Sequence, residues 1–375
     1  MLVSTPGRYA FLDAMDALDA GASVMVFSDN VPVAQEVRLK EAAADRGLLV
    51  MGPDCGTAIV GGVGLGFANV VRPGPVGLVA ASGTGAQQVM SLLDATGTGI
   101  SHCLGVGGRD LSSAVGGLST VAALDALEAD DATELIVVVS KPPADDVAQR
   151  VRARAAELTT PVVFALLGPG RPDLTMVVDG VLSRLGRAVP ASWPVWRPIR
   201  PARPGRRGFL RGFFAGGTLC DEAMVIASAV LGPIRSNIPL RPEWALAGVP
   251  DDPLPGAHTM VDFGDDGLTR GRPHPMIDPT FRLDRLAAEL ADPSCGVIVA
   301  DVVLGHAADP DPAAGLAPVL AMAQDRGVPV VISLTGTAGD PQGLGAQADA
   351  LRGAGATVLL SNAAAARFAA SLATT

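Results

Sequence analysis

The sequence predicts an α/β protein built on parallel sheets that helices cover on both faces. Short apolar runs rich in Val, Ile and Leu alternate with Ala-rich amphipathic stretches. Strands that are apolar along their whole length and alternate with helices are typical of parallel sheets, because both faces are buried. Several of these strands end in glycine-rich turns that open the next helix. A chain of 375 residues is long enough for two or three domains of ordinary size.

The first half contains a regular succession of strands and helices. We expect strands at 22–28, 48–51, 76–81, 134–140 and 161–167, and a further strand that ends at GVGG (105–108). We expect helices at 33–46, 85–96, 117–129 and 144–158. A break at Arg72-Pro73-Gly74-Pro75 separates residues 1–71 from 72–188. Residues 1–71 offer two strands with none before them, so this piece is expected to be an incomplete α/β unit.

Residues 189–208, VPASWPVWRPIRPARPGRRG, form a predicted linker. A helix cannot continue through prolines at this spacing. The alternation then resumes over residues 209–375, which predict a flavodoxin-like domain. Its helices are expected at 218–231, 280–291, 312–326, 341–354 and 362–373, and its strands at 258–263, 296–303, 328–334 and 356–360.

The composition excludes several classes of function. The formal net charge of −10 disfavours nucleic acid or an anionic membrane as a partner. Only two lysines are present, Lys40 and Lys141, which leaves few candidates for a Schiff-base or P-loop lysine. Four widely spaced cysteines without a C-x-x-C pair indicate reduced thiols and a cytoplasmic location. We see no transmembrane helix and no secretory signal.

Two segments combine glycines with hydroxyl side chains at the start of a predicted helix. The first is Ser82-Gly83-Thr84-Gly85, after the strand VGLVAA, and the second is Gly216-Gly217-Thr218. Backbone N–H groups and the helix dipole favour an anion at such a turn. The two starts together therefore predict a phosphate or other anion held from two sides. The alternative is a pair of capped tight turns. Neither segment fits a P-loop or a hydrolase nucleophile elbow.

Two glycine segments of the first half are further candidates. GGVGLG (61–66) is a loose match to a dinucleotide fingerprint, but no helix clearly follows it. Gly108 and Arg109 end a predicted strand, where ligands of open parallel sheets bind. Arg109 is suited to bind a carboxylate or a phosphate. The alternative is a surface ion pair between Arg109 and Asp110.

The densest polar block is DFGDDGLTRGRPHPMIDP (262–279), directly after a strand. His274 stands between two prolines and is a candidate general acid or base, with Asp265 or Asp266 beside it. Arg270 and Arg272 suit an anionic substrate. No spacing here is diagnostic of a metal site, and the alternative is a solvated charged loop. Asp301, His306 and GTAGDPQ (336–342) also end strands and are expected on the same rim.

The order of these motifs resembles the FdrA family. The resemblance rests on MGPDCGTAIVGGVGLGFANVVRPGPVGLVAASGTG, GVGGRDLS, FAGGTLCDEA, GDDGLTRGRPHPMIDP and GTAGDPQ, and it extends over most of the chain. FdrA proteins are similar to fused parts of succinyl-CoA synthetase, in the NDP-forming acyl-CoA synthetase superfamily. The resemblance implies a partial Rossmann-like CoA-binding domain followed by two flavodoxin-like ligase domains. It also implies that the two glycine–hydroxyl starts face one phosphoryl group, with Asp54 and Cys55 in the substrate site.

Three features depart from the superfamily pattern. No histidine lies between His102 and His258, so the segment GPGRPDLT (168–175) lacks a phosphohistidine. Nothing resembles an ATP-grasp domain, and the sequence begins inside the expected CoA-binding domain. The resemblance therefore favours a subunit of a phosphate-dependent carbamoyl- or acyltransferase, similar to oxamate carbamoyltransferase. Its ligands would be phosphate or carbamoyl phosphate and a small anionic acyl or carbamoyl substrate.

Two other functions remain open from the sequence. One is an acyl-CoA synthetase-like ligase that binds CoA and needs partner chains for its missing parts. The other is a non-catalytic scaffold or regulatory subunit. In each case we expect other protein subunits or a homo-oligomer, and no metal.

Overall fold

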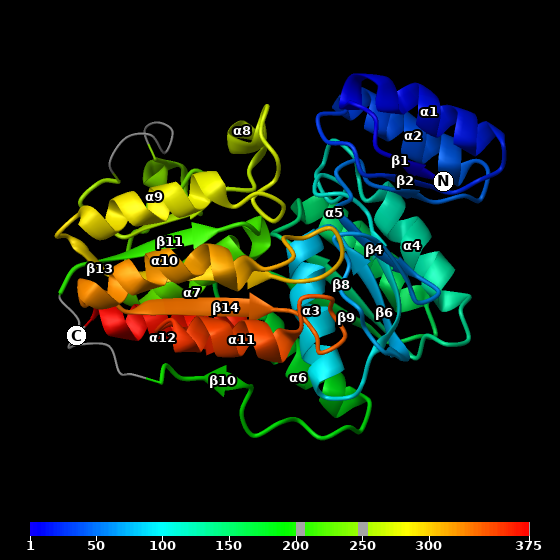
Figure 1. Cartoon of the computed structure of the whole chain (residues 1–375). Coiled ribbons are helices and arrows are strands. Elements are labelled where there is room, and N and C mark those ends of the chain that lie inside the picture. The colour runs from blue at the N-terminus through cyan, green and yellow to red at the C-terminus, as the bar shows by residue number, and fades with distance from the viewer. Residues whose placement is uncertain (200–206, 247–253, 375) are drawn as a thin grey trace. The chain divides into compact units, whose positions relative to one another are not determined.

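The computed structural model describes residues 1–199, 207–246 and 254–374. The chain forms two compact units, Met1–Val189 and Pro190–Thr375 (Figure 1). The first unit contains two sheets and the second contains one. The predicted mixture of parallel strands and covering helices is confirmed in both units. The boundaries predicted at 71/72 and 208/209 stay predictions.

The first 51 residues contribute a small parallel sheet with two helices. Its strands β1 (Leu2–Val3), β2 (Val24–Val26) and β3 (Val50–Met51) pair in the order β1-β2-β3. The helices are α1 (Gly7–Asp19) and α2 (Val33–Ala44), which pack against each other. The expectation of two strands with none before them is wrong, because β1 precedes them. A strand of two residues is too short to give an alternating pattern, and α1 also escaped the sequence prediction.

The larger sheet of the first unit has the order β5-β4-β7-β6-β8-β9. Four strands are parallel: β6 (Pro73–Ala80), β7 (Ile100–Gly105), β8 (Leu135–Ser140) and β9 (Val162–Leu166). The edge is an antiparallel hairpin of β4 (Thr57–Val60) and β5 (Val63–Gly66). The segment GGVGLG is therefore a hairpin, with Gly61 and Gly62 at positive φ in its turn. A dinucleotide fingerprint requires a helix after its glycines, so this hairpin is not a dinucleotide-binding turn.

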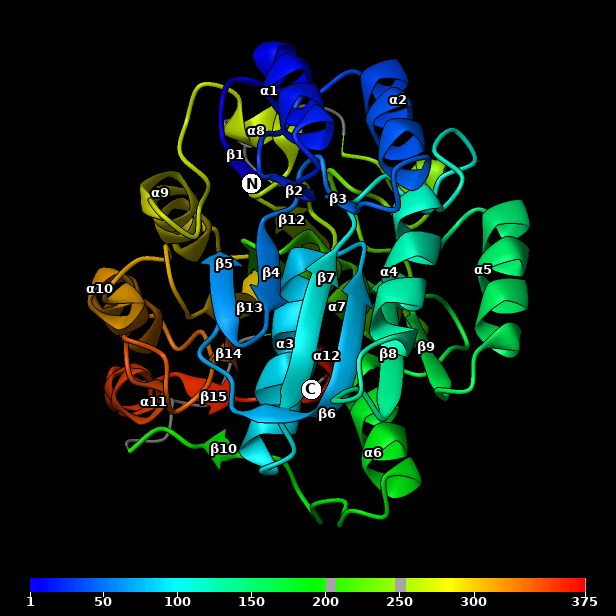
Figure 2. The same cartoon turned by 90° about the vertical axis from the view of Figure 1, so that its right-hand side faces the viewer.

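Helices cover both faces of this sheet (Figure 2). They are α3 (Gly83–Ala95), α4 (Leu118–Glu128), α5 (Asp145–Glu157) and α6 (Leu174–Arg184). α3 packs beside α6, and α4 packs beside α5 and α2. α6 starts inside the segment that lacks a phosphohistidine, where the Asp173 side chain accepts the N–H of Met176 at 2.8 Å. That segment is thus a capped helix start.

The sheet of the second unit has the order β10-β15-β14-β13-β11-β12. Its parallel strands are β11 (Phe209–Phe214), β12 (Thr259–Asp262), β13 (Cys295–Val303), β14 (Val330–Thr335) and β15 (Thr357–Leu359). β10 (Val195–Trp196) pairs antiparallel with β15 and falls inside the segment predicted as a linker, part of which (200–206) lies outside the described residues.

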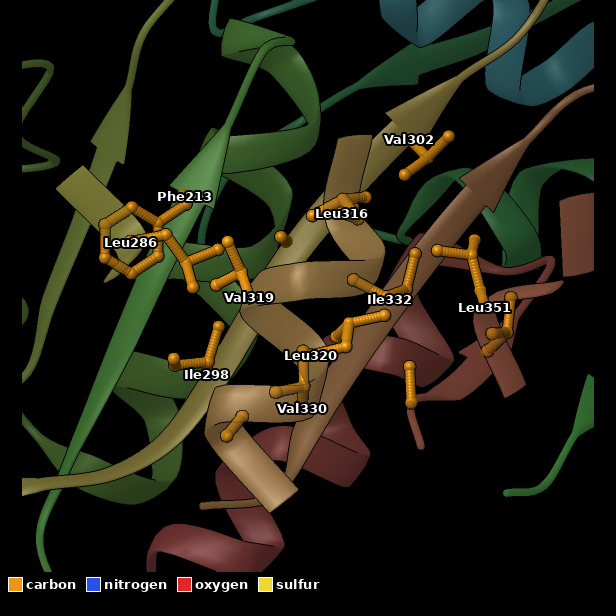
Figure 3. Close-up of a cluster of buried hydrophobic side chains, with 14 of the residues drawn as sticks. Phe213, Leu286, Ile298, Val302, Leu316, Val319, Leu320, Val330, Ile332 and Leu351 are labelled. Carbon is orange, nitrogen blue, oxygen red and sulfur yellow. The ribbon is translucent and has the colours of Figure 1, made fainter. Parts of the chain in front are cut away.

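Within the described residues, seven helical segments accompany this sheet. They are α7 (Gly217–Leu231), a 3₁₀ turn at Pro242–Trp244, α8 (Asp266–Thr269), α9 (Thr280–Ala291), α10 (Pro312–Asp325), α11 (Leu344–Gly353) and α12 (Asn362–Ala373). Apolar side chains of α9, α10 and α11 pack on one face of the sheet in a single buried cluster (Figure 3). α7 and α12 pack together. No helix in the described ranges is long and apolar enough to cross a membrane.

Candidate functional site

Each of the two larger sheets has a topological switch point, and a predicted glycine–hydroxyl helix start lies at each one. In the first unit the chain leaves β6 toward β7 and leaves β8 toward β9, in opposite directions along the sheet. In the second unit it leaves β11 toward β12 and β13 toward β14, again in opposite directions. Ligands of open α/β sheets bind at such points, outside the carboxyl ends of the strands. α3 follows β6 and α7 follows β11, so both starts occupy this position in their own unit.

The start of α3 presents backbone donors. Ser82 is its N-cap residue, and the Ser82 hydroxyl accepts the N–H of Gly85 at 3.0 Å. In the part of the chain that the structure describes, no acceptor bonds the backbone N–H groups of Gly83 and Thr84. Both N–H groups point along the helix axis toward its N-terminus, where the dipole is positive. This start can therefore bind an anion with two donors, in addition to being a capped turn.

The GPDC segment lies against the ends of β6 and β7. Gly107 has φ +88°, and a Cβ there would lie 2.4 Å from the carbonyl oxygen of Pro53, so only glycine fits. A Cβ on Gly108 would lie 3.8 Å from Oδ2 of Asp54 and 4.0 Å from the carbonyl oxygen of Ala81. Asp54 and Gly108 thus lie close together next to the start of α3, and their role in binding a substrate stays a prediction.

Cys55 belongs to the interior of this region. Its side chain is buried, and its Sγ donates to the carbonyl oxygen of Thr57 at 3.5 Å. Burial raises the pKa of the Cys55 thiol to about 12. A thiol in this state is not a nucleophile at neutral pH. Cys55 supports the site by packing, and the structure gives it no contact surface for a substrate.

Arg109 and Asp110 do not form the surface ion pair that was the alternative reading. Arg109 Nη2 lies 3.0 Å from Glu36 Oε2 and donates to the carbonyl oxygen of Val31 at 2.8 Å. Asp110 is fully buried and accepts from Lys40 Nζ at 2.8 Å. Lys40 also bonds Glu36 at 2.8 Å and is itself buried. This network joins α2 to the loop after β7, so Lys40 is a structural residue and Arg109 is already partnered.

The start of α7 differs from that of α3 because a carboxylate already occupies part of it. Asp301 on β13 accepts the N–H groups of Ala215 at 2.7 Å and Gly216 at 2.9 Å. Arg282 on α9 balances this charge, with its Nη1 2.7 Å from Asp301 Oδ1. Burial raises the pKa of Asp301, against the opposing effect of Arg282 and of the two N–H groups. Among the described residues, the backbone N–H of Gly217 has no acceptor, and Thr218 beside it is buried.

His274 lies close to this helix start, in the loop between α8 and α9. A Cβ on Gly264 would lie 2.8 Å from His274 Nε2, 3.2 Å from Asp262 Oδ1 and 2.5 Å from the carbonyl oxygen of Ala215. The Nδ1 atom of His274 accepts the N–H of Met276 at 3.2 Å, which places the proton of the neutral ring on Nε2. Burial, and secondarily Arg282, lower the pKa of His274 to about 4. At neutral pH this side chain is an uncharged hydrogen-bond donor through Nε2, and not an imidazolium acid.

The other predicted residues of the polar block differ in their surroundings. Asp265 is the N-cap of α8, and its carboxylate accepts the N–H of Gly267 at 2.9 Å. Asp266 and Arg270 are exposed. Arg272 is also exposed, and its guanidinium lies 4.1 Å from the centroid of the Phe281 ring. The block is therefore partly a structured turn and partly a charged surface, and not a uniformly solvated loop.

A pocket of about 310 Å³ opens beside α8 and the start of α9. Its apolar lining includes Phe263, Leu268 and Phe281, and its charged lining includes Arg272 and Arg282. Sequence reasoning missed the pocket, because Phe263 and Phe281 are 18 positions apart and no local motif marks them. The described residues contain no group of His, Cys, Asp and Glu side chains that could hold a metal ion.

The comparisons with known proteins define the class of protein. A family model described as CoA-ligase matches residues 213–372, which form most of the second unit. Over these residues the second unit is similar to CoA-ligase domains. The uncharacterized protein YahF of Escherichia coli (strain K12) is 39% identical over 377 residues, which cover 94% of this chain and 73% of YahF. The chain belongs to the family of YahF.

More distant relatives are subunits of CoA ligases. The succinate–CoA ligase [ADP-forming] subunit alpha of Methanothermobacter thermautotrophicus is 26% identical over 174 residues, which cover 46% of this chain and 58% of the relative. The match therefore spans less than two thirds of that subunit. The dinucleotide-forming acetyl-coenzyme A synthetase 1 of Ca. Korarchaeum cryptofilum aligns with a TM-score of 0.32 at 15% identity, over 100% of this chain and 83% of the other.

Proposed function

We propose that this protein is an FdrA-type subunit of a phosphate-dependent transferase, which moves a carbamoyl or acyl group between phosphate and a small acceptor. The kinship with YahF over nearly the whole chain and the order of the FdrA-like motifs support the assignment. The CoA-ligase domain supports acyl chemistry as the class. The absence of histidine between His102 and His258 in the sequence argues against a phosphohistidine route.

The proposal rests mainly on the geometry at the start of α3. It offers the N–H groups of Gly83 and Thr84 at a topological switch point, without an acceptor among the described residues. In the forward direction, a nitrogen of the acceptor attacks the carbonyl carbon of carbamoyl phosphate. The carbon–oxygen bond to phosphate breaks, phosphate leaves with the electron pair, and the nitrogen loses a proton to a base or to water. N–H donors at a helix start stabilise the charge that grows on the phosphate.

The second unit supplies the remaining groups in this proposal. The N–H of Gly217 and the Nε2–H of neutral His274 are donors that can polarise a carbonyl oxygen. Asp266 is an exposed carboxylate that can accept the proton.

A proline substitution at the first residue of α3 tests the proposal. Gly83→Pro removes one N–H donor at the first helical position, where proline is tolerated. We expect phosphate and carbamoyl phosphate to raise the melting temperature of the wild-type chain. The variant should bind both about 10- to 100-fold more weakly, because it loses a charge-assisted hydrogen bond. Gly83→Ala is the steric control, since it keeps the N–H.

Asp145→Pro is the matched control for the effect of placing a proline at the first residue of a helix. Asp145 is the exposed first residue of α5, the helix that follows β8. It should bind phosphate as the wild type does. Unchanged phosphate affinity in Gly83→Pro would contradict an anion site at the start of α3. The same holds if neither ligand stabilises the wild type, and in either case the proposed transferase function fails.

The second candidate is an acyl-CoA ligase-like subunit that needs partner chains. The similarity to a succinate–CoA ligase alpha subunit over 46% of the chain favours it. This function predicts that CoA raises the melting temperature, and that phosphate alone does not. A chain that responds to neither ligand, but copurifies with another subunit, would instead be a scaffold.

A further inference from the structure

Lys141 directly follows β8, at the topological switch point of the first unit. β6 and β8 are parallel neighbours, and Ala80 pairs with Val139 in their register. The N–H of Ala81 donates to the carbonyl oxygen of Val139 at 2.9 Å, so the pairing extends to the end of β6. Two residues further along each segment, Lys141 is level with Ser82, the N-cap residue of α3. Adjacent strands lie about 4.8 Å apart, so Lys141 is about one strand spacing from the start of α3.

The alternation of side chains along β8 directs Lys141 to the face of the sheet that α3 covers. Ile136 and Val138 belong to a buried cluster that also contains residues of α4 and α5. α3 contacts β8 and contributes no residue to that cluster, so it covers the opposite face. Successive side chains of a strand alternate between the faces, and this alternation, continued by one residue, puts Lys141 on the side of α3. The Lys141 side chain is partly buried, which fits a place beside a helix.

Lys141 adds to this place the positive charge that α3 itself lacks. The N–H groups of Gly83 and Thr84 are neutral donors without an acceptor among the described residues. An ammonium group adds an attraction between charges, which favours an anion over a neutral ligand. Lys40 is the other lysine of the chain, and it cannot serve here because two buried carboxylates pair with it at 2.8 Å.

The charges on the two sides of the α3 start have opposite signs. β7 and β8 flank β6 on opposite sides. On the β7 side, a Cβ on Gly108 would lie 3.8 Å from Oδ2 of Asp54. On the β8 side stands Lys141. An anionic group at the start of α3 is therefore drawn toward β8, and the uncharged part of the same ligand faces β7.

We propose that Lys141 is a phosphate-binding residue of the first unit, and that its ammonium pairs with the phosphoryl oxygens that Gly83 and Thr84 also bind. The inference rests on the proposed transferase, to whose anion site it adds a charged ligand residue. The ammonium has three donors and acts on phosphate as a point charge. It makes the preferred ligand a phosphoryl dianion, and it needs no group of the second unit. In the reaction it stabilises the charge that grows on the leaving phosphate.

Calorimetric titration of the full chain with inorganic phosphate tests the inference. We expect Lys141→Met to bind phosphate about 10- to 100-fold more weakly, because it loses a charge-assisted hydrogen bond. Lys141→Arg keeps the positive charge and should retain most of the affinity. Added KCl should weaken phosphate binding in the wild type, and it should do so less in Lys141→Met. A purely structural role of Lys141 would leave this salt dependence unchanged.

Arg184→Met is the matched control for the loss of one positive charge from the first unit. Arg184 is exposed and is the last of the 11 residues of α6. At a rise of 1.5 Å per residue, it lies about 15 Å along the helix from the helix start that follows β9. Arg184→Met should bind phosphate as the wild type does. The side chains changed in these variants are exposed or partly buried, so the melting temperatures without phosphate should stay close to the wild-type value.

The same titration of Gly83→Pro separates this inference from the proposed function. Wild-type affinity in Lys141→Met, with weak binding in Gly83→Pro, would overturn the role of Lys141 and leave the α3 site in place. A loss in Lys141→Met alone would overturn the shared site, because the lysine would then bind an anion without α3. Weak binding by Lys141→Arg, or an equal loss in Arg184→Met, would overturn the role of the charge. A wild-type chain that does not bind phosphate would refute both the inference and the proposed function.

Discussion

The strongest test of the second unit is the removal of Arg282 from its pair with Asp301. Asp301 is completely buried, and the Arg282 side chain is 6% exposed. In Arg282→Met the carboxylate keeps the N–H groups of Ala215 and Gly216, but it loses the only cation that pairs with it within the described ranges. Methionine retains an unbranched apolar stem of similar length, so the change removes mainly the charge. We expect a large and pH-dependent loss of stability.

The expected loss of stability can be calculated for two states of the buried carboxylate, ionised and protonated. If Asp301 stays ionised without its partner, the cost is about 3–5 kcal/mol. If it instead takes up a proton at pH 7, against an ordinary pKa of about 3.9, the cost is about 1.36 kcal/mol for each pH unit, or about 4 kcal/mol. Burial already raises the pKa of Asp301 in the native protein, and Arg282 is the largest opposing influence. Both routes therefore predict a loss of about 4 kcal/mol at pH 7.

The pH dependence of the stability loss shows whether Asp301 takes up a proton in the variant. A carboxyl whose pKa is raised on folding stabilises the folded state below its unfolded pKa, and loses that contribution as the pH rises through the folded pKa. The penalty in Arg282→Met should thus shrink by about 2.7 kcal/mol between pH 7 and pH 5. Urea denaturation of both proteins at the two pH values measures it. A loss below about 1 kcal/mol at pH 7, the same at both pH values, would refute the buried ion pair. The double variant Arg282→Met/Asp301→Asn should recover much of the lost stability.

Three further predictions concern other residues of the two units. Ser82→Ala removes the cap of α3 and should lower the unfolding free energy by about 1 kcal/mol in urea titrations. His274, with its pKa lowered to about 4, costs the folded state up to about 3 kcal/mol as the pH falls from 6.5 to 4; His274→Gln should flatten that part of the stability curve. Lys40→Met leaves Glu36 and Asp110 buried without their ammonium, and should cost about 3–5 kcal/mol by chemical denaturation.

The long elements of the fold could be predicted from sequence, and the short ones could not. The expected helix at 33–46 is α2 (Val33–Ala44), and the expected strand at 134–140 is β8 (Leu135–Ser140). Each of these elements is long enough for the periodicity of its apolar residues to be recognised in the sequence. β1 and β10 have two residues each, so only pairing with a neighbouring strand defines them. The hairpin at Gly61 was missed because its glycines fit a nucleotide-binding turn equally well in sequence.

The candidate site was predictable where one local segment carries the chemistry. Ser82 and Gly83 start a helix as expected, since a strand, two glycines and a hydroxyl are consecutive in the chain. The partners that decide how a site behaves are distant in sequence. Asp301 was expected on the rim of the sheet, but its bonds to Ala215 and Gly216 cross 85 or more positions. The low pKa of His274 likewise depends on burial, which no local pattern gives.

The two helix starts are therefore not equivalent as anion sites, although their sequences predicted the same role. An anion at the start of α7 meets the carboxylate of Asp301, which already accepts the N–H of Gly216. Arg282 offsets that charge, so the start is close to neutral and not strongly attractive. At the start of α3 the cap is the uncharged hydroxyl of Ser82, and the N–H groups of Gly83 and Thr84 have no acceptor among the described residues. The helix dipole acts there on N–H groups that no carboxylate accepts within the described residues. Phosphate should consequently bind first at α3, and the α7 start is better suited to the neutral carbonyl of an acyl or carbamoyl group.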